Sequence, residues 1–187
     1  MEDSELGVFQ SGTILDKQIL SDDLINDLIK IVDEFDPSNK PLNGSLAHRV
    51  RIDEADIDKL NSEIIQSTKS ELNATLIGYF PDMEIGEMRI YCQTFGDIKP
   101  HIDVATDGKS NVTCLIYLTD GYEGGELNIK IKRKDLTMNP EKEHFKFTIT
   151  PKKGYGVCFN KDSLHYANEV FGKKLILLID LKTSFLC

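Results

Sequence analysis

The second half of the chain is a succession of short β-rich runs, and this pattern constrains the fold more than any other feature of the sequence. The runs are rich in β-branched, aliphatic and aromatic residues, and Gly, Pro, Asp and Asn stand between them. They cover residues 87–95, 111–119, 125–133, 144–150, 155–160, 164–170 and 174–181. Many short strands separated by turn residues are typical of a β-sandwich or a barrel.

The last of these runs is apolar on both of its faces. Leu175, Leu177 and Ile179 occupy one face of the predicted strand, and Ile176 and Leu178 occupy the other. A strand of this kind is covered on both sides. We expect helices from the N-terminal half to provide one cover, so that helices pack on a β-sandwich.

Two amphipathic helices are predicted in the N-terminal half. The first begins after Ser21, an N-cap candidate, and ends near Pro37, with apolar residues at helical spacing between them. The second covers roughly residues 53–72, with Asp53 as its cap candidate. Residues 36–49 contain two Pro, one Gly and few apolar groups. That composition predicts a long loop, and we expect it to act as a lid over the substrate.

The chain is predicted to form a single domain over residues 1–187. Its 40% share of hydrophobic residues is enough to bury a core. Residues 1–80 are expected to provide the helical support and the lid, and residues 85–187 the β core. Within this core, the hydrophilic stretch 130–147 is predicted to be a long surface hairpin.

Charge and hydropathy exclude several classes of function. The chain has 22 Lys and Arg against 31 Asp and Glu, so its net charge of −9 repels polyphosphates and no nucleic-acid partner is expected. No apolar run approaches the roughly 20 residues of a membrane helix, and the opening segment is acidic where a signal peptide is basic. We therefore expect an intracellular, cytoplasmic protein without a membrane partner. A local basic cluster is the one feature that points the other way: Lys130, Lys132, Arg133 and Lys134.

The cysteines are spread along the chain without any C-x-x-C pair. They are Cys92, Cys114, Cys158 and Cys187, and three of them lie in apolar, strand-like runs. This distribution predicts free thiols in a reducing compartment.

A candidate metal site comes from two histidines and one aspartate. His101 and Asp103 are two residues apart, so in an extended segment their side chains leave the same face. His165 begins another β-rich run 62 residues later. Two imidazoles and one carboxylate with open positions form the facial triad of non-haem Fe(II) oxygenases. The H-x-D pair alone is weak evidence, because such short patterns arise by chance.

The order of residues around this pair is more specific. The stretches 89–103, 111–129 and 155–181 resemble the prolyl-4-hydroxylase-like branch of the Fe(II)/2-oxoglutarate-dependent dioxygenases. The resemblance implies a double-stranded β-helix, a distorted jelly roll, preceded by supporting helices. It also implies Fe(II) as the metal and O₂ and 2-oxoglutarate as co-substrates, with ascorbate as a candidate additional cofactor.

The resemblance also assigns roles to individual residues. It implies that His101, Asp103 and His165 are the catalytic iron ligands. It implies that a basic residue after Gly172 binds the distal carboxylate of 2-oxoglutarate, and Lys174 is the better candidate. Because it opens the apolar strand, it can point into the barrel, whereas Lys173 would be solvated. Two tyrosines of the resembled family bond the same carboxylate, and they match Tyr91 and Tyr117.

Other residues near these motifs are expected to have no chemical role. Residues 124–127, GGEL, resemble the turn into the next strand of the family and are interpreted as structural. The remaining two histidines and the two arginines after the loop are expected to be surface residues: His48, His144, Arg49 and Arg51. Substrate contact by Arg49 or Arg51 is the alternative.

The substrate follows least directly from the sequence. We expect an enzyme that hydroxylates a C–H bond of a polypeptide, on a prolyl or similar residue, because backbone hydrogen bonds can hold an extended segment in an acidic protein. The chain has no Trp, although many relatives carry one near the substrate mouth. Two alternatives therefore stay open: an oxygenase of a small molecule or free amino acid, and a non-catalytic β-helix or cupin-like binding module.

Overall fold

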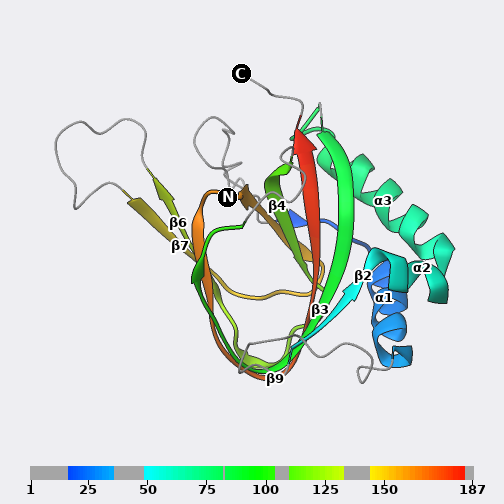
Figure 1. The fold of residues 1–187 in the computed structure, drawn as a ribbon, viewed down its shortest axis with the longest axis horizontal. Coiled ribbons are helices and arrows are strands. Elements are labelled where there is room, and N and C mark those ends of the chain that lie inside the picture. Colours follow the sequence, from blue (N-terminus) through cyan, green and yellow to red (C-terminus); the bar gives the residue numbers. More distant parts are fainter. Residues whose placement is uncertain (1–16, 36–48, 82, 104–109, 133–143, 184–187) are drawn as a thin grey trace, which may run out of the picture.

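In this computed structural model, residues 17–35, 49–81, 83–103, 110–132 and 144–183 are described. They form an antiparallel sheet that folds into a barrel, with the helices on one side of it and the β6–β7 hairpin projecting on the other (Figure 1). The helices are α1 (Asp22–Glu34), α2 (Glu54–Leu60) and α3 (Ser62–Leu76). The strands are β1 (Lys17–Gln18), β2 (Arg49–Asp53), β3 (Met83–His101), β4 (Ser110–Tyr117), β5 (Glu123–Gly124), β6 (Leu127–Lys132), β7 (His144–Ile149), β8 (Tyr155–Asn160) and β9 (Leu164–Thr183).

Two long strands, β3 and β9, organise the barrel. They pair antiparallel along most of their length, and β9 also pairs with β4, β5 and β6. The main path of the sheet runs β1-β8-β4-β9-β3-β2, and β6 and β7 join it through β9. Register shifts interrupt the β3–β9 ladder near Gly96, and Gly96 and Gly172 have φ values of 89° and 116°. Such bulges and glycines let a strand bend from one wall of the barrel to the other. The arrangement of the strands confirms the predicted double-stranded β-helix.

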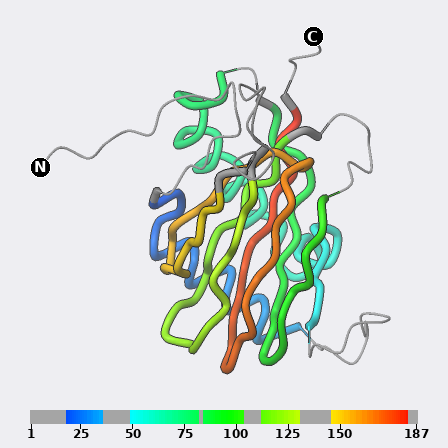
Figure 2. Tube along the Cα trace, turned by 90° about the vertical axis from the view of Figure 1, so that its left-hand side faces the viewer, coloured from blue at the N-terminus to red at the C-terminus, as the bar shows by residue number. Residues whose placement is uncertain are grey.

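Successive side chains of β9 point alternately into two hydrophobic cores. Leu175, Leu177 and Ile179 of β9 pack in the larger core, which contains the buried residues of α1, α2 and α3. Ile176 faces the barrel interior, where it packs in a second core with Tyr117 and other buried side chains. The helices therefore cover one face of β9, as the apolar pattern predicts, and Figure 2 shows the barrel strands from the side of the β6–β7 hairpin.

The N-terminal half differs from its prediction in two respects. The first helix begins after Ser21 as expected, but the predicted helix over 53–72 is two helices, because β2 extends to Asp53 and the chain breaks at Asn61. The Asn61 side chain accepts hydrogen bonds from the backbone N–H groups of Glu63 and Ile64 and so caps α3. β1 and β2 also add two strands that the sequence pattern did not predict.

Several other expectations can be compared with the structure. The hairpin predicted over 130–147 is present as the β6–β7 pair, and its residues 133–143 lie outside the described part of the chain. Residues 36–48 of the predicted lid also lie outside it. Cys92, Cys114 and Cys158 are free thiols. Within the described residues, no helix is long and apolar enough to cross a membrane.

Candidate active site

The structure brings His101, Asp103 and His165 together at one end of the barrel. His101 is the last residue of β3, His165 lies at the start of β9, and the two are register partners. Asp103 follows two residues after His101. One ligand atom from each residue lies within 4.8 Å of the other two, and Asp103 Oδ1 is 3.8 Å from His101 Nε2 and 3.7 Å from His165 Nε2. This cluster can hold one divalent metal ion.

Hydrogen bonds orient all three side chains toward this centre. His101 Nδ1 lies 2.8 Å from the Lys99 carbonyl oxygen, and His165 Nδ1 lies 3.0 Å from the Ser163 carbonyl oxygen. A carbonyl only accepts, so each Nδ1 carries the proton and each Nε2 keeps a lone pair for a metal. The Thr113 hydroxyl donates to Asp103 Oδ2 at 2.6 Å, which leaves Oδ1 facing the histidines.

The two histidines differ in their exposure to solvent. The His165 side chain is 8% exposed and its ring lies 4.7 Å from that of Phe159. Desolvation lowers the pKa of His165 and so favours the neutral imidazole that a metal requires. The His101 side chain is 42% exposed, so the metal cluster is open to solvent on that side.

Lys174 lies inside the barrel, on the same face of β9 as Ile176. It is 4% exposed, its ammonium donates to the Gly125 carbonyl at 2.8 Å, and Nζ lies 5.8 Å from the centre of the Tyr117 ring. Burial, with a further contribution from Arg49, lowers the pKa of Lys174 to about 8. A buried ammonium of this kind can receive a carboxylate. Lys173 points out and pairs with Asp33 of α1 at 2.5 Å, so the two lysines take the orientations that the strand register predicts.

The GGEL turn contributes more than the sequence indicated. Gly124 and Gly125 both have φ values of 74°, which confirms the tight turn. The Gly125 carbonyl also fixes the Lys174 ammonium, and a Cβ added at Gly125 would lie 3.3 Å from Lys174 Nζ. The turn therefore has the structural role that was expected, and its backbone also holds the buried cation in place.

The predicted tyrosines both lie near Lys174, together with Tyr122, which the sequence did not single out, and Arg49. Tyr117 is 1% exposed, and Tyr91 packs at the edge of the same interior core. The Tyr122 hydroxyl is buried without a hydrogen-bond partner, and burial raises its pKa. Arg49 stacks on Tyr91, with its guanidinium carbon 3.9 Å from the ring centre.

Arg49 corrects one expectation of the sequence. It is half-buried with a fully buried Nε, so it is not a solvated surface residue. Arg51 does lie partly in solvent and pairs with Asp53 at 2.5 Å. His48 and the side chain of His144 lie outside the described part of the structure.

A buried ion network also lies next to the metal cluster. Lys161 Nζ is 2.6 Å from Asp180 Oδ1, and the Arg89 guanidinium donates to Asp180 Oδ2. The network reaches Asp103 through backbone and register contacts: the Asp103 N–H donates to the Lys161 carbonyl at 3.0 Å, and Thr113 is the register partner of Asp180. The sequence analysis missed this network, because Asp180 stands alone among the apolar residues of β9.

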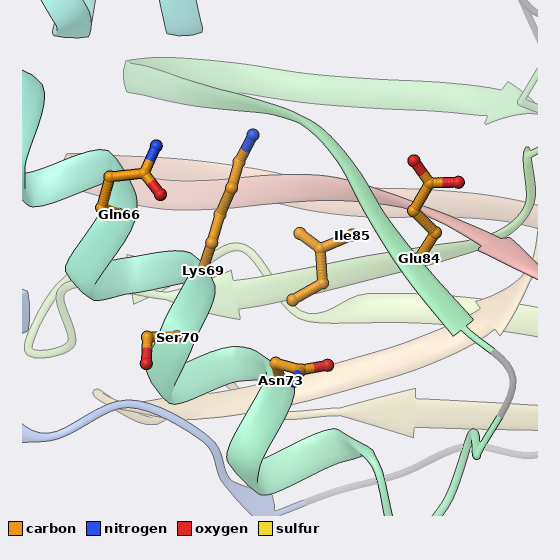
Figure 3. A pocket seen from close by; sticks show the side chains of 6 residues that line it. All are labelled: Gln66, Lys69, Ser70, Asn73, Glu84 and Ile85. Atoms are coloured by element: carbon orange, nitrogen blue, oxygen red, sulfur yellow. The ribbon is translucent and has the colours of Figure 1, made fainter.

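A separate depression of about 370 Å³ lies between α3 and β3, on the helical side of the molecule (Figure 3). All but one of its lining residues are polar or charged, and none belongs to the metal cluster: Gln66, Lys69, Ser70, Asn73, Glu84 and Ile85. It contains neither the His-Asp-His cluster nor Lys174, so we assign the chemistry to the barrel interior.

Comparison with solved structures shows the same fold in several oxygenases. A prolyl-4-hydroxylase from Pseudomonas putida is 16% identical, with 93% of this chain and 94% of that chain covered and a TM-score of 0.62. The non-heme alpha ketoglutarate dependent epimerase SnoN from nogalamycin biosynthesis is 11% identical, with coverage of 93% and 77% and a TM-score of 0.69. A Trichoplax adhaerens prolyl hydroxylase, solved with a hypoxia inducible factor oxygen degradation domain peptide, is 16% identical, with coverage of 94% and 84% and a TM-score of 0.60.

The comparison by sequence identifies the family. No curated protein matches the chain. The sequence profile of the 2OG-Fe(II) oxygenase superfamily matches residues 66–179, which contain the metal cluster and Lys174. Members of this superfamily use Fe(II) and 2-oxoglutarate, and the His-Asp-His cluster suits that metal. The protein belongs to the 2OG-Fe(II) oxygenase superfamily and is a 2-oxoglutarate-dependent Fe(II) dioxygenase.

Proposed function

We propose that this dioxygenase hydroxylates a C–H bond of a polypeptide, on a prolyl or similar residue. His101, Asp103 and His165 hold the iron, and Lys174 binds the distal carboxylate of 2-oxoglutarate. The observation that carries the proposal is the convergence of the three ligand atoms within 4.8 Å, with both Nδ1 atoms held by backbone carbonyls. A surface cluster of charged residues has no reason to present both Nε2 lone pairs to one point.

Fe(II) and 2-oxoglutarate, when bound, supply the oxidation: one O₂, one 2-oxoglutarate and one C–H bond give succinate, CO₂ and an alcohol. The chain's own residues supply position. Thr113 holds Asp103 Oδ2, so that Oδ1 stays turned toward the metal. The Gly125 carbonyl accepts a hydrogen bond from the Lys174 ammonium and so holds it in place, and the same ammonium can donate a second hydrogen bond to the far carboxylate of the co-substrate. Tyr91 and Tyr117 provide phenol donors beside this carboxylate.

Two lines support a polypeptide substrate. A prolyl hydroxylase of the same fold was solved with a peptide. His101 is on the exposed side of the metal cluster, where an extended segment can approach from solvent. A second candidate, an oxygenase of a small molecule, is favoured by the likeness in fold to the epimerase SnoN from nogalamycin biosynthesis.

The test separates the reaction class from the substrate. The protein is titrated anaerobically with Fe(II) and 2-oxoglutarate, and succinate is measured after exposure to air. Release of succinate by the wild type and not by His165→Ala supports the proposed site. Metal binding without any succinate would support a non-catalytic binding module instead. Peptide pools, free amino acids and methylated oligonucleotides are then incubated with the enzyme. Mass spectrometry shows which of them gains one oxygen or loses a methyl group. Hydroxylation of peptides alone agrees with the proposal.

A further inference from the structure

Arg49 projects into the barrel beside the proposed co-substrate site. It is the register partner of Gln93 in β3, and Gln93 is the register partner of Lys174 in β9, so the three residues form one row across adjacent strands. Val50 and Ile52, the alternate residues of β2, pack in the core under the helices. Arg49 therefore belongs to the opposite, interior face. Its guanidinium lies on the Tyr91 ring at 3.9 Å, which fixes its plane.

Within the described part of the chain, the Arg49 guanidinium has no partner of opposite charge. Among the described residues it makes no ion pair or hydrogen bond, and its Nε is buried. Burial lowers the pKa of Arg49, and the charge of Asp103 in the metal cluster is among the effects that oppose this shift. An unpaired polar group of this kind is costly to bury and needs an explanation, such as a ligand that completes it.

Among the described residues, the cations on neighbouring positions of these strands already have carboxylate partners, including the partly exposed Arg51. Arg51 pairs with Asp53, and Arg89 and Lys161 share Asp180, with Glu87 also 3.4 Å from Arg89. A bound Fe(II) would be balanced by Asp103 and one carboxylate of 2-oxoglutarate, and Lys174 by the other. Arg49 remains as one positive charge in excess inside the barrel.

We propose that Arg49 is a specificity residue that binds a carboxylate of the substrate. A guanidinium can donate two parallel hydrogen bonds to a carboxylate, and stacking on Tyr91 holds it ready to do so. The substrate class is thereby narrowed to molecules with an acidic group close to the reacting carbon: an acidic residue beside the target in a polypeptide, or the free carboxylate of an amino acid. This inference rests on the proposed function, because the charge balance places Fe(II) and 2-oxoglutarate in the barrel, and the probe titration below tests the carboxylate site separately from turnover.

The first experiment measures carboxylate binding without turnover. Protein loaded with Zn(II) and saturating 2-oxoglutarate is titrated with N-acetylglutamate N-methylamide, whose only charge is its side-chain carboxylate. N-acetylglutamine N-methylamide is the matched neutral probe. The wild type should bind the acidic probe about tenfold more tightly or better, as expected for hydrogen bonds between charged groups, and the Arg49 Nε–H signal should shift in NMR spectra. Equal affinity for the two probes would overturn the proposal.

Variants assign the effect to Arg49. Arg49→Gln should lose the preference for the acidic probe, and Arg49→Lys should recover part of it. Arg51→Gln, the neighbouring cation that already has a carboxylate partner, should keep it. Retention of the preference in Arg49→Gln would overturn the proposal. The affinity of each variant for 2-oxoglutarate serves two purposes. It shows whether the variant is folded, and it shows whether Arg49 binds the carboxylate of 2-oxoglutarate instead of a carboxylate of the substrate. If Arg49→Gln weakens 2-oxoglutarate as strongly as Lys174→Met does, Arg49 holds the co-substrate and the proposal is wrong.

The second experiment identifies the source of the substrate carboxylate. Peptide pools that differ only by Glu or Gln at one position near a central proline are compared with free acidic amino acids and their amides. Hydroxylation that favours Glu pools at one position, or free acids over amides, supports the proposal and names the source. Equal hydroxylation of acids and amides would contradict it. If no candidate is hydroxylated and no succinate forms, the proposed function fails, while the probe titration still decides the role of Arg49.

Discussion

Replacement of Lys174 by Met should weaken co-substrate binding and at the same time stabilise the free protein. The side chain is 4% exposed and its pKa is lowered to about 8, chiefly by desolvation. The difference from the usual 10.5 corresponds to about 3 kcal/mol by which burial disfavours the charged form. Because the pKa is lower in the folded state, this cost is fully present below pH 8 and disappears as the pH rises toward 10.5.

Met removes that cost, so the variant should unfold at a higher urea concentration at pH 7, with a gain of up to about 3 kcal/mol. It also leaves the distal carboxylate of 2-oxoglutarate without a partner. The loss should be roughly 3 to 5 kcal/mol, or two to three decades in affinity, as for broken buried ion pairs. Isothermal titration calorimetry with 2-oxoglutarate on the Zn(II)-loaded protein measures this second effect.

Lys173→Met is the matched control, because Lys173 is a surface residue of the same hairpin and pairs with Asp33. It should change stability by less than about 1 kcal/mol and leave the affinity for 2-oxoglutarate unchanged. If Lys174→Met destabilises the protein and binds 2-oxoglutarate like the wild type, the assignment of Lys174 is refuted. If Lys173→Met shows the affinity loss instead, the cation that holds the co-substrate has been misassigned.

Three further predictions follow from the site. Affinity for 2-oxoglutarate should fall above about pH 8 by up to tenfold per pH unit, because Lys174 must be protonated to bind; calorimetry across pH tests this, and a flat profile in Lys174→Arg is the expected control. Thr113→Val should lower metal affinity about 10- to 100-fold while far-UV circular dichroism stays unchanged, because Asp103 Oδ2 loses its donor; equal affinity would show that Thr113 does not orient the ligand. Gly125→Ala should both destabilise the fold and weaken 2-oxoglutarate binding, since φ is positive and a Cβ would press toward Lys174; a variant like the wild type in urea unfolding and calorimetry would contradict this.

The sequence predicts those parts of the site that depend on strand periodicity. Alternation along β9 separates Lys174 from Lys173, and the H-x-D spacing places His101 and Asp103 at one point. The family resemblance supplies His165 and the double-stranded β-helix. The structure places these residues as expected because they lie in or next to long strands whose faces are set by apolar neighbours.

The features that were not predicted depend on contacts between residues far apart in the chain or on single side chains, which the local sequence pattern does not indicate. β2 is five residues long and alternates only twice, so nothing in the sequence marks Arg49 as an interior residue. The break at Asn61 depends on a side-chain cap, which competes with an otherwise continuous helical pattern. Lys161 and Arg89 meet Asp180 only after β3, β9 and the turn after β8 come together. Gly125 acts through its carbonyl, which sequence cannot assign to a partner.

We propose that His101, Asp103 and His165 together hold one catalytic iron. Anaerobic titration of the wild type and of His165→Ala with Fe(II) tests this assignment most directly. Asp162→Ala, at an exposed residue of the turn that precedes β9, is the control. The wild type and the control should bind one equivalent of Fe(II) and release succinate when 2-oxoglutarate and air are added. His165→Ala should lose most Fe(II) binding with an unchanged circular dichroism spectrum, because apolar packing holds the strands. Fe(II) bound as tightly by His165→Ala as by the wild type would contradict the assignment.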